Sequence, residues 1–312
     1  MKLAMVFPGQ GSQSVGMMAG YSDYPVVQET FTAASATLGQ DLWTLASEGP
    51  DTELNQTVNT QPVMLTADMA VHAAWSAIGG KAPALVAGHS LGEYAALVAA
   101  SAIAFAEALP LVRFRAQAMQ DAVPAGVGAM AAVMGLDERD IAAACAESAQ
   151  GQVVEPVNFN APGQTVIAGH KEAVERAIVA AKAKGAKRAL LLPVSAPFHS
   201  SLLKPAAERL AAYLGKVSIQ LPTIPVIHNV DVRVADSADG IRTALAKQAA
   251  NAVRWVETIE AFASQGVTHI VECGPGKVLT GLVKRIAPGI EALPLNDSDA
   301  IAAAVDTVNA AP

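Results

Sequence analysis

The sequence predicts an α/β fold, in which alanine-rich helices cover a well-buried sheet and a smaller βαββαβ unit is inserted. Three observations support this prediction. Hydrophobic residues make up 52% of the 312-residue chain and charged residues only 16%, which excludes a disordered protein and allows a sizeable core. Short apolar runs end at glycine- or proline-rich turns and alternate with longer helical stretches. Between residues 128 and 195 the predicted strands and helices follow the order βαββαβ.

The composition also narrows the partners and the compartment. A net charge of −7 argues against nucleic acid as the main partner. The longest uncharged apolar stretch near the centre, residues 94–106, is shorter than the roughly 20 residues that cross a bilayer, and the apolar start is too short for a secretory signal. Cys145 and Cys273 cannot form a disulfide framework. We therefore expect a cytoplasmic protein that binds neither nucleic acid nor membrane.

The first 127 residues predict a strand, a polar loop and a series of helices. The opening apolar run breaks at Pro8-Gly9, and the loop over 8–13 is rich in glycine and amides without fitting the dinucleotide fingerprint. The further elements expected here are helical chain to about residue 38, a helix over 60–78 with proline in its first turn, a strand over 84–87, and helices over 91–104 and 106–122.

Gly88-His89-Ser90-Leu91-Gly92 lies between a predicted strand and a predicted helix, and it is the strongest sign of chemistry in the chain. A strand, a sharp turn and a helix in this order form a nucleophile elbow, which exposes the serine hydroxyl above the sheet. Unpaired N–H groups at the start of the helix can bind the negative charge that develops on an attacked carbonyl oxygen. The alternative is a serine that only caps the helix.

Arg115 is a lone cation on the apolar face of the helix over 106–122. At about 100° per residue, apolar neighbours such as Leu111 and Met119 share its face, whereas Arg113 points the other way. A buried guanidinium needs an anionic partner, and its planar fork suits a carboxylate. The pattern leaves two possibilities open, a carboxylate ligand or a structural ion pair with an acidic residue of the core.

The segment 128–195 is predicted to form the inserted unit. Its expected elements are a strand over 129–134, a helix over 138–148, strands over 153–159 and 164–168, a helix over 171–184 and a strand over 189–194. This βαββαβ order is that of a ferredoxin-like subdomain. We therefore expect residues 1–127 and 196–312 to form one domain and residues 128–195 a second.

A serine nucleophile needs a base, and imidazole has a suitable pKa near neutrality. His199 lies in an irregular segment after Pro197, where a loop can be held over a site. Five other histidines compete with it, namely His72, His89, His170, His228 and His269. His89 should point away from its neighbour Ser90, and the others fit packed or surface positions. The pattern alone does not decide among them.

The remaining chain predicts mostly structural elements. These are a helix to about 214, a strand over 224–229, a polar loop to 239, a helix from 241, another helix after 255, a strand over 267–272 and a helix to 286. The turn at residues 273–277 lacks the spacing of a phosphate loop, and we see no cluster of metal ligands.

Several motifs, in order and across nearly the whole chain, resemble those of the malonyl-CoA:acyl carrier protein transacylases. They are Phe7-Pro8-Gly9-Gln10-Gly11-Ser12-Gln13, Gln61-Pro62, Gly88-His89-Ser90-Leu91-Gly92-Glu93, Arg115 with Met119-Gln120, Pro197-Phe198-His199-Ser200 and Glu272-Cys273-Gly274-Pro275-Gly276. The resemblance implies a hydrolase-like α/β core with a mainly parallel sheet and a ferredoxin-like insert, in agreement with the predicted order of elements.

The resemblance also implies a role for each main candidate. Ser90 would attack the malonyl thioester, and His199 would act first as general base and then as general acid. The backbone N–H groups of Gln10 and Leu91 would form the oxyanion hole. Arg115 would hold the malonyl carboxylate through a bidentate pair.

Three further positions follow from the resemblance. Gln61 would line the site, and the main-chain carbonyl at Gln248, rather than an aspartate, would orient His199. Phe198 stands where serine is usual in bacterial fatty-acid transacylases, whereas phenylalanine is associated with malonyl-selective acyltransferases of polyketide synthases. We therefore hypothesise that Phe198 fills the space that an α-methyl group would need.

The implied reaction is a ping-pong transfer in fatty acid biosynthesis. Malonyl-CoA acylates the serine, CoA leaves, and the phosphopantetheine thiol of a transiently bound, acidic acyl carrier protein takes the malonyl group, with no cofactor or metal bound to the enzyme. Lys182, Lys184, Lys187 and Arg188 are candidates for docking the carrier, although cations at a helix C-terminus also have a structural explanation. The alternatives are a thioester hydrolase, the transacylase subunit of a malonate decarboxylase and an inactive carrier-binding homologue.

Overall fold

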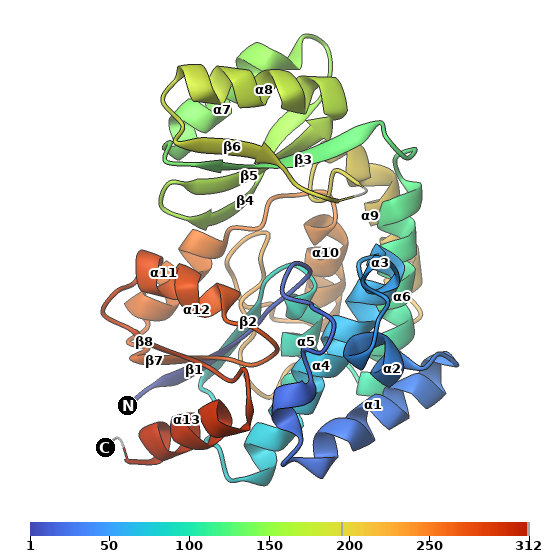
Figure 1. The fold of residues 1–312 in the computed structure, drawn as a ribbon, viewed down its shortest axis with the longest axis vertical. Helices are drawn as coiled ribbons and strands as arrows, with labels where there is room; N and C mark the ends of the chain where they lie inside the picture. The colour runs from blue at the N-terminus through green and yellow to red at the C-terminus, as the bar shows by residue number, and fades with distance from the viewer. Residues whose placement is uncertain (195, 311–312) are drawn as a thin grey trace.

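Two four-stranded sheets organise the chain, whose computed structural model describes residues 1–194 and 196–310 (Figure 1). Ser195, at the expected boundary of the insert, lies outside the described residues, as do residues 311 and 312 of the tail. In Figure 1 one sheet lies in the upper part with two helices above it, and the other lies lower down among the remaining helices. The predicted α/β class is thus confirmed.

The lower sheet is parallel throughout and has the strand order β2-β1-β7-β8. Its strands are β1 (Leu3–Phe7), β2 (Leu85–Gly88), β7 (His269–Glu272) and β8 (Glu291–Pro294). Every residue of β1 and β2 is buried, as expected for parallel strands covered on both faces. Because parallel strands end at the same edge, Phe7 pairs with Gly88 and Val6 with Glu272, so that the loops after β1, β2 and β7 meet there.

The upper sheet confirms the predicted βαββαβ order of the insert. It contains β3 (Gly128–Met134), α7 (Glu138–Ala149), β4 (Val154–Ala161), β5 (Gln164–His170), α8 (Lys171–Ala183) and β6 (Arg188–Leu191). The strands are antiparallel in the order β4-β5-β3-β6. One face packs against α7 and α8 through a small apolar cluster of its own, whereas Met130 and Val166 on the other face join the main core.

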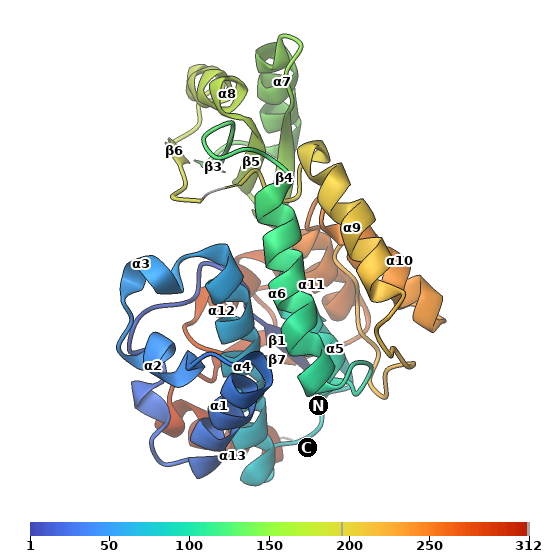
Figure 2. The ribbon, with the colours of Figure 1, turned by 90° about the vertical axis from the view of Figure 1, so that its right-hand side faces the viewer.

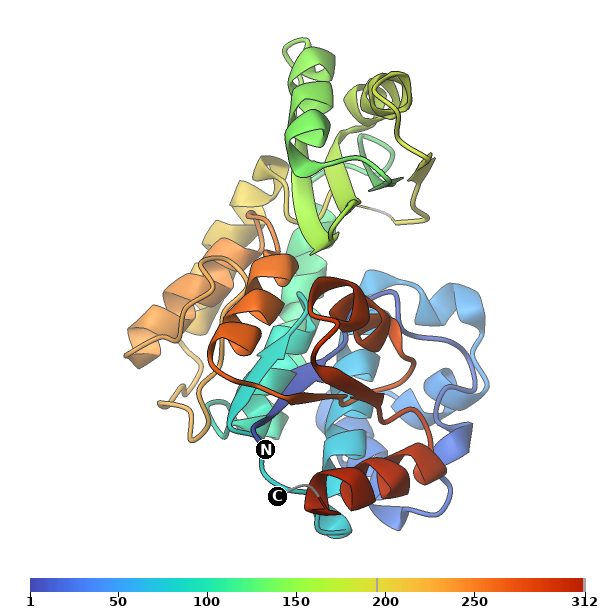
Figure 3. The same ribbon diagram turned by 90° about the vertical axis from the view of Figure 1, so that its left-hand side faces the viewer.

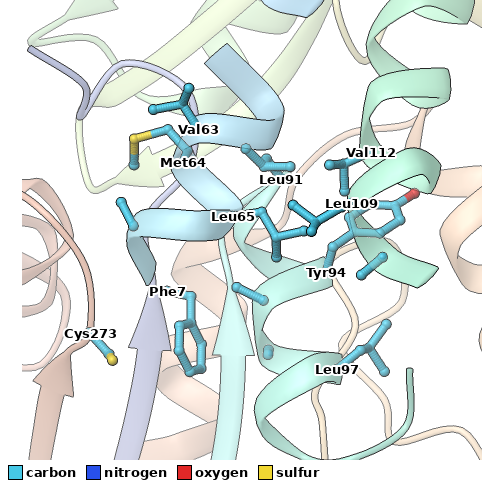
Figure 4. Packing of buried hydrophobic residues seen from close by; sticks show 14 of the residues in the cluster. Phe7, Val63, Met64, Leu65, Leu91, Tyr94, Leu97, Leu109, Val112 and Cys273 are labelled. Carbon is cyan, nitrogen blue, oxygen red and sulfur yellow. The ribbon is translucent and has the colours of Figure 1, made fainter. Parts of the chain in front are cut away.

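Helices of the first half of the chain pack against one another. They are α1 (Pro25–Leu38), α2 (Leu42–Ser47), α3 (Asp51–Leu54), α4 (Thr57–Ala77), α5 (Gly92–Ala99) and α6 (Phe105–Asp121), with a short 3-10 turn, η1 (Ala19–Tyr21), before them. Figure 4 shows Leu65 of α4, Tyr94 of α5, and Leu109 and Val112 of α6 converging, with Phe7 of β1 to the lower left in the same core. Figure 2 shows α6 running from the lower helices up to the insert.

Two helix predictions need correction. The proline predicted in the first turn of its helix, Pro62, lies inside α4, because the N–H groups of Asn59 and Thr60 already donate to the Gln56 carbonyl and start the helix earlier. The helix predicted to run to about residue 104 ends at Ala99. It ends there because Ser101 adopts a left-handed conformation, with φ 59°, before α6 begins.

The second half of the chain returns along the other side of the molecule. It contains η2 (Ser201–Leu203), α9 (Lys204–Leu214), α10 (Ala238–Gln248), α11 (Trp255–Ser264), α12 (Val278–Ile286) and α13 (Ser298–Ala310). Figure 3 shows α11 and α12 between the lower sheet and the insert, and both helices contact β4. The sequence pattern did not predict β8 or α13.

The strand predicted over residues 224–229 is wrong. This segment makes a single parallel bridge, between Val226 and Val86 of β2. Pro225 has no N–H to extend a ladder. The next N–H groups turn elsewhere, because His228 donates to the Arg233 carbonyl and Asn229 donates to a Glu93 side chain. The segment therefore leaves the sheet and passes beneath the turn after β2.

Among the described residues, no helix is both long enough and apolar enough to cross a membrane.

Candidate active site

Ser90 lies at a strained turn between β2 and α5. Its φ of 54° falls in the left-handed region, which non-glycine residues rarely adopt. A Cβ at Gly88 would lie 1.9 Å from the carbonyl carbon of Gly92, and one at Gly92 would lie 2.1 Å from the Phe7 carbonyl oxygen. Both glycines are therefore required for the chain to fold this tightly, which is the geometry of a nucleophile elbow.

Asn229 fixes this turn from below. Its Oδ1 accepts a 2.7 Å hydrogen bond from the Ser90 N–H, and its Nδ2 donates at 2.7 Å to the Gly88 carbonyl. The side chain is fully buried, so these bonds do not compete with water. The backbone N–H of Ser90 is thus occupied, and the hydroxyl remains free to face the pocket.

His199 is in hydrogen-bonding distance of Ser90, with 2.7 Å between its Nε2 and the serine Oγ. Its Nδ1 lies 2.8 Å from the Gln248 main-chain oxygen, which can only accept, so Nδ1 carries the proton and Nε2 is left to accept from the hydroxyl. The structure therefore brings the predicted serine, histidine and carbonyl together. Among the described residues, no carboxylate forms an ion pair with this imidazole.

The environment keeps His199 neutral. Burial and then the positive charge of Arg115 lower the pKa of the imidazole to about 3, although the bond to the Gln248 carbonyl works in the opposite direction. A neutral imidazole is the form that accepts a proton from serine. The residue itself has φ 65°, so the second partner of this pair also sits in a strained backbone conformation.

Arg115 is buried and points toward the same serine. Its Nη1 donates to Gln61 Oε1 at 2.8 Å, and its Nη2 donates to Gln248 Oε1 at 2.8 Å and to Ser90 Oγ at 3.1 Å. The guanidinium carbon lies 5.3 Å from the centre of the Tyr94 ring. None of the ion pairs between described residues includes Arg115, so the structural ion pair left open above is excluded for them. Among the described residues, the hydrogen bonds of this cation go to neutral oxygens.

The loop after β1 lies directly on the turn. A Cβ at Gly9 would lie 2.4 Å from the His89 carbonyl oxygen and 3.5 Å from the Leu91 nitrogen, so only glycine permits this approach. Gln10 follows it, and its side chain donates to Thr57 at 3.3 Å. Gln10 and Leu91 consequently line one pocket with the serine.

The pocket has a polar floor and an apolar wall. Its floor contains the serine, histidine and arginine described above, together with Gln61. The wall comes largely from the insert and the chain that follows it, and consists of Met130, Val166, Leu192, Val194 and Phe198, with Asn158 among them. Phe198 is 8% exposed and stands next to His199 along the chain.

A sequence model of the family described as "Acyl transferase domain" matches residues 4–292, nearly the whole chain. The chain belongs to this acyl transferase family. The resemblance to malonyl-CoA:acyl carrier protein transacylases is confirmed by a relative from Escherichia coli (strain K12), named malonyl CoA-acyl carrier protein transacylase. It is 58% identical over 306 residues, which are 98% of this chain and 99% of the relative.

Solved structures agree with this membership. The acyl-carrier-protein S-malonyltransferase of Burkholderia pseudomallei 1710b is 58% identical, with a TM-score of 0.97 over 98% of this chain and 100% of that one. The structure of a type II PKS acyl-carrier protein in complex with its malonyl-transacylase also contains a matching chain. That chain is 54% identical, with a TM-score of 0.97, again over 98% of this chain and 100% of that one.

Sequence reasoning missed several residues of this acyltransferase site. Asn229 and the Gln248 amide give no local signal, because each contacts Ser90 across more than a hundred residues of chain. Glu93 lies in the motif, yet nothing in the pattern indicated that its carboxylate is fully buried. His89 bonds to Asn160 at 2.8 Å and does not bond to the serine.

The other histidines that were weighed against His199 lie away from the reacting atoms. Among them, His228 pairs with Glu93 at 2.7 Å behind the turn. Of the basic residues suggested for docking, Lys184 forms an ion pair with Glu147 at 2.8 Å. Among the described residues, no group of three or more histidine, cysteine or acidic side chains could hold a metal ion.

Proposed function

We propose that this acyltransferase moves malonyl from malonyl-CoA to the phosphopantetheine thiol of an acyl carrier protein, through a malonyl ester on Ser90, in fatty acid biosynthesis. The observation that carries the proposal is Arg115, a buried cation without a carboxylate partner among the described residues, 3.1 Å from the serine oxygen. Malonyl offers both a thioester for the serine and a carboxylate for the cation. An acyl group without a carboxylate would leave this buried charge unpaired.

In the first half of the reaction, Ser90 Oγ attacks the thioester carbonyl while His199 Nε2 takes its proton. The carbon–sulfur bond then breaks, and the imidazolium returns the proton to the departing CoA sulfur. In the second half, the carrier thiol gives its proton to His199 and attacks the carbonyl of the serine ester, the bond between the acyl carbon and Ser90 Oγ breaks, and the same proton returns to Ser90 Oγ. The 2.7 Å separation of Oγ and Nε2 supports both transfers.

The Gln248 carbonyl stabilises the imidazolium that forms in each half. It accepts the Nδ1 proton at 2.8 Å and so fixes the tautomer, a task for which serine hydrolases commonly use a carboxylate. The N–H groups of Leu91 and Gln10 would donate to the oxyanion, and the position of both residues in the pocket beside the serine supports this role. Loss of one such donor typically lowers the rate by roughly 10²- to 10³-fold.

Arg115 binds the malonyl carboxylate. Its Nη2 then exchanges the bond to the serine oxygen for a carboxylate oxygen, while Gln61 and Gln248 keep the guanidinium in place from the two sides. Phe198 limits the space beside the carbon between the two carbonyl groups. We therefore expect a preference for malonyl over methylmalonyl, and exchange of Phe198 for serine should weaken it, whereas an unchanged preference would rule this role out.

The partners follow from the same proposal. The carrier is an acidic protein bound transiently, and Lys182, Lys184, Lys187 and Arg188 of the insert are candidates for its docking surface. The enzyme needs no bound cofactor or metal, because serine, histidine and arginine supply the chemistry. We place it in the cytoplasm, where CoA esters are available, and assign residues 1–127 and 196–312 to the catalytic domain and 128–195 to the ferredoxin-like one.

Intact-mass spectrometry tests the function directly. Mixing the protein with malonyl-CoA should add one malonyl group, peptide mapping should place it on Ser90, and a carrier bearing phosphopantetheine should then remove it faster than water does. A Ser90→Ala variant serves as the control. Absence of the adduct, or its loss to water as fast as to the carrier thiol, would contradict transfer and favour a hydrolase.

A further inference from the structure

A buried carboxylate, Glu93, lies behind the nucleophile in the first turn of α5, and the reaction described above does not use it. Its side chain is fully buried and accepts three hydrogen bonds. Oε1 accepts from His228 Nδ1 at 2.7 Å, and Oε2 accepts from the Asn229 N–H and from Gln248 Nε2, both at 2.9 Å. A desolvated carboxylate with these donors holds them in fixed positions.

Gln248 is the residue through which this carboxylate reaches the reacting groups. Its main-chain oxygen accepts from His199 at 2.8 Å, and its side-chain Oε1 accepts from Arg115 at 2.8 Å. Its Nε2 donates to the Ser90 carbonyl at 2.8 Å as well as to Glu93. One glutamine therefore contacts the nucleophile, the base and the cation.

The orientation of the Gln248 amide decides whether these contacts are favourable. Rotation of the amide by 180° would place its NH₂ group against the Arg115 guanidinium, which also only donates. It would place the oxygen against the Ser90 carbonyl and the Glu93 carboxylate, which only accept. A buried contact of donor with donor, or of acceptor with acceptor, costs the full desolvation free energy of the groups concerned. Glu93 thus stabilises the single orientation that gives Arg115 an acceptor.

We propose that Glu93 is a positioning residue for malonyl transfer, which acts through the Gln248 amide to aim Arg115 at the acyl carboxylate. The inference rests on the proposed function, since it concerns the choice of acyl group at the same serine. It assigns Glu93 no contact with substrate. Its effect should therefore appear in the preference for malonyl more than in the general reactivity of the serine.

Two substitutions of Glu93 separate positioning from charge. In Glu93→Gln, the amide oxygen can replace Oε2 and its NH₂ group can face His228, which accepts through Nδ1 in its other neutral tautomer. The acceptor for Gln248 is then retained. Glu93→Met has a similar length but offers no acceptor. Gln248→Met removes the amide while keeping the main-chain oxygen for His199.

The test compares two reactions of Ser90 in the full-length protein, namely acylation by malonyl-CoA and labelling by a fluorophosphonate, which carries no carboxylate. We expect Glu93→Met and Gln248→Met to lower malonyl acylation by roughly 10- to 100-fold more than fluorophosphonate labelling. Malonyl acylation of Glu93→Gln should stay within about threefold of the wild-type rate. Malonyl acylation of the double Met variant should be no slower than that of the slower single variant, since both substitutions act through one contact.

Three results would overturn the proposal. Equal loss in both reactions would show that Glu93 only supports the fold, and additive losses in the double variant would show that it does not act through Gln248. If Glu93→Met does not fold, an unchanged ratio of the two rates in Gln248→Met decides against the proposal. The wild-type protein tests the proposed function separately, because failure of malonyl-CoA to acylate it would contradict that function whatever the variants do.

Discussion

The Arg115 side chain is buried, positively charged and hydrogen-bonded to neutral acceptors, and each of these properties has a separate cause in the sequence. Its position on the apolar face of α6 buries it, and Gln61 and Gln248 supply oxygen acceptors from α4 and α10. Two amide oxygens accept from the guanidinium without neutralising its charge, and its buried Nε has no hydrogen-bond partner among the described residues. The residue is thereby ready to pair with an anion that enters the pocket.

Arg115→Ala should reduce the preference for malonyl. We expect acylation by malonyl-CoA to fall by roughly 10- to 100-fold relative to acylation by acetyl-CoA, the range of a lost charge-assisted hydrogen bond. Competition between the two CoA esters, read by mass spectrometry, measures the ratio. Arg113→Ala is the matched control, since Arg113 donates to Leu38 and Gln40 outside the pocket. An equal loss with both esters would mean that Arg115 is structural.

The depressed pKa of His199 predicts an unusual pH profile. An ordinary histidine base loses activity below about pH 6.5, whereas a pKa of about 3 keeps this one neutral throughout mildly acidic solution. We expect kcat/KM for formation of the malonyl enzyme to stay level from about pH 8 to about pH 5. Quenched-flow mass spectrometry measures it, and an acid limb centred near pH 6.5 would contradict the assigned environment.

The same residue links pH to stability, with a defined sign. The unfolded chain takes up a proton on this histidine near pH 6.5, whereas the native protein does so only near pH 3. The unfolded state therefore binds more protons in this window, and the contribution of His199 to the free energy of unfolding falls as the pH drops through it.

At the scale of elements, the turn after β2 shows what local sequence can predict. Strand, glycine, serine, glycine and helix follow one another within a few residues, so the elbow could be predicted before its geometry was known. The partners of Ser90 could not, since Asn229 and Gln248 reach it from distant segments. The role of the Gln248 carbonyl came from family resemblance alone.

The predicted strand over 224–229 failed for a related reason. Its short apolar run resembles a strand, but the hydrogen bonds of Asn229 are directed to the elbow and to Glu93. A segment that supports an active site gives up regular pairing to do so. Local patterns do not reveal where a backbone donor finds its acceptor.

Because β1 and α5 approach closely, one methyl group added between them should strongly lower the free energy of unfolding. In Gly92→Ala the new Cβ would lie 2.1 Å from the Phe7 oxygen, a backbone atom that cannot move aside cheaply. We expect a loss of at least about 3 kcal/mol in the free energy of unfolding, at or beyond the upper end for overpacking. Urea denaturation followed by circular dichroism measures it.

Gly281→Ala provides the control on the exposed side of α12. No atom lies within 4 Å of a Cβ there, so alanine should stabilise the helix by about 0.5–1 kcal/mol. If both substitutions change stability by the same amount, contact with Phe7 does not explain the glycine in the motif.

At the scale of the whole molecule, one buried acid joins distant parts of the chain. Asp68 of α4 is fully buried against the turn after β7, and neither of its carboxylate oxygens has a hydrogen-bond partner among the described residues. A Cβ at Gly274 would lie 2.2 Å from its Oδ1. Burial, with a smaller contribution from the charge of Glu272, raises its pKa well above the usual value.

Asp68→Asn should therefore change the pH dependence of stability. A raised native pKa means that the neutral acid stabilises the fold at low pH and that this contribution is lost as the pH rises. Between pH 5 and pH 8 the free energy of unfolding of the wild type should fall relative to that of the variant, whose amide does not titrate. Urea midpoints at the two pH values measure the difference, and parallel curves would contradict it.

The pocket draws its floor and its wall from different sheets. Ser90, His199 and Arg115 depend on the parallel sheet and its helices, whereas Met130 and Val166 project from the antiparallel sheet. The reaction and the shape of this part of the wall are therefore separable traits, whereas Phe198 stands next to His199. Randomising only the antiparallel wall offers a route to transferases for new building blocks, because Ser90, His199 and Arg115 keep their own supports.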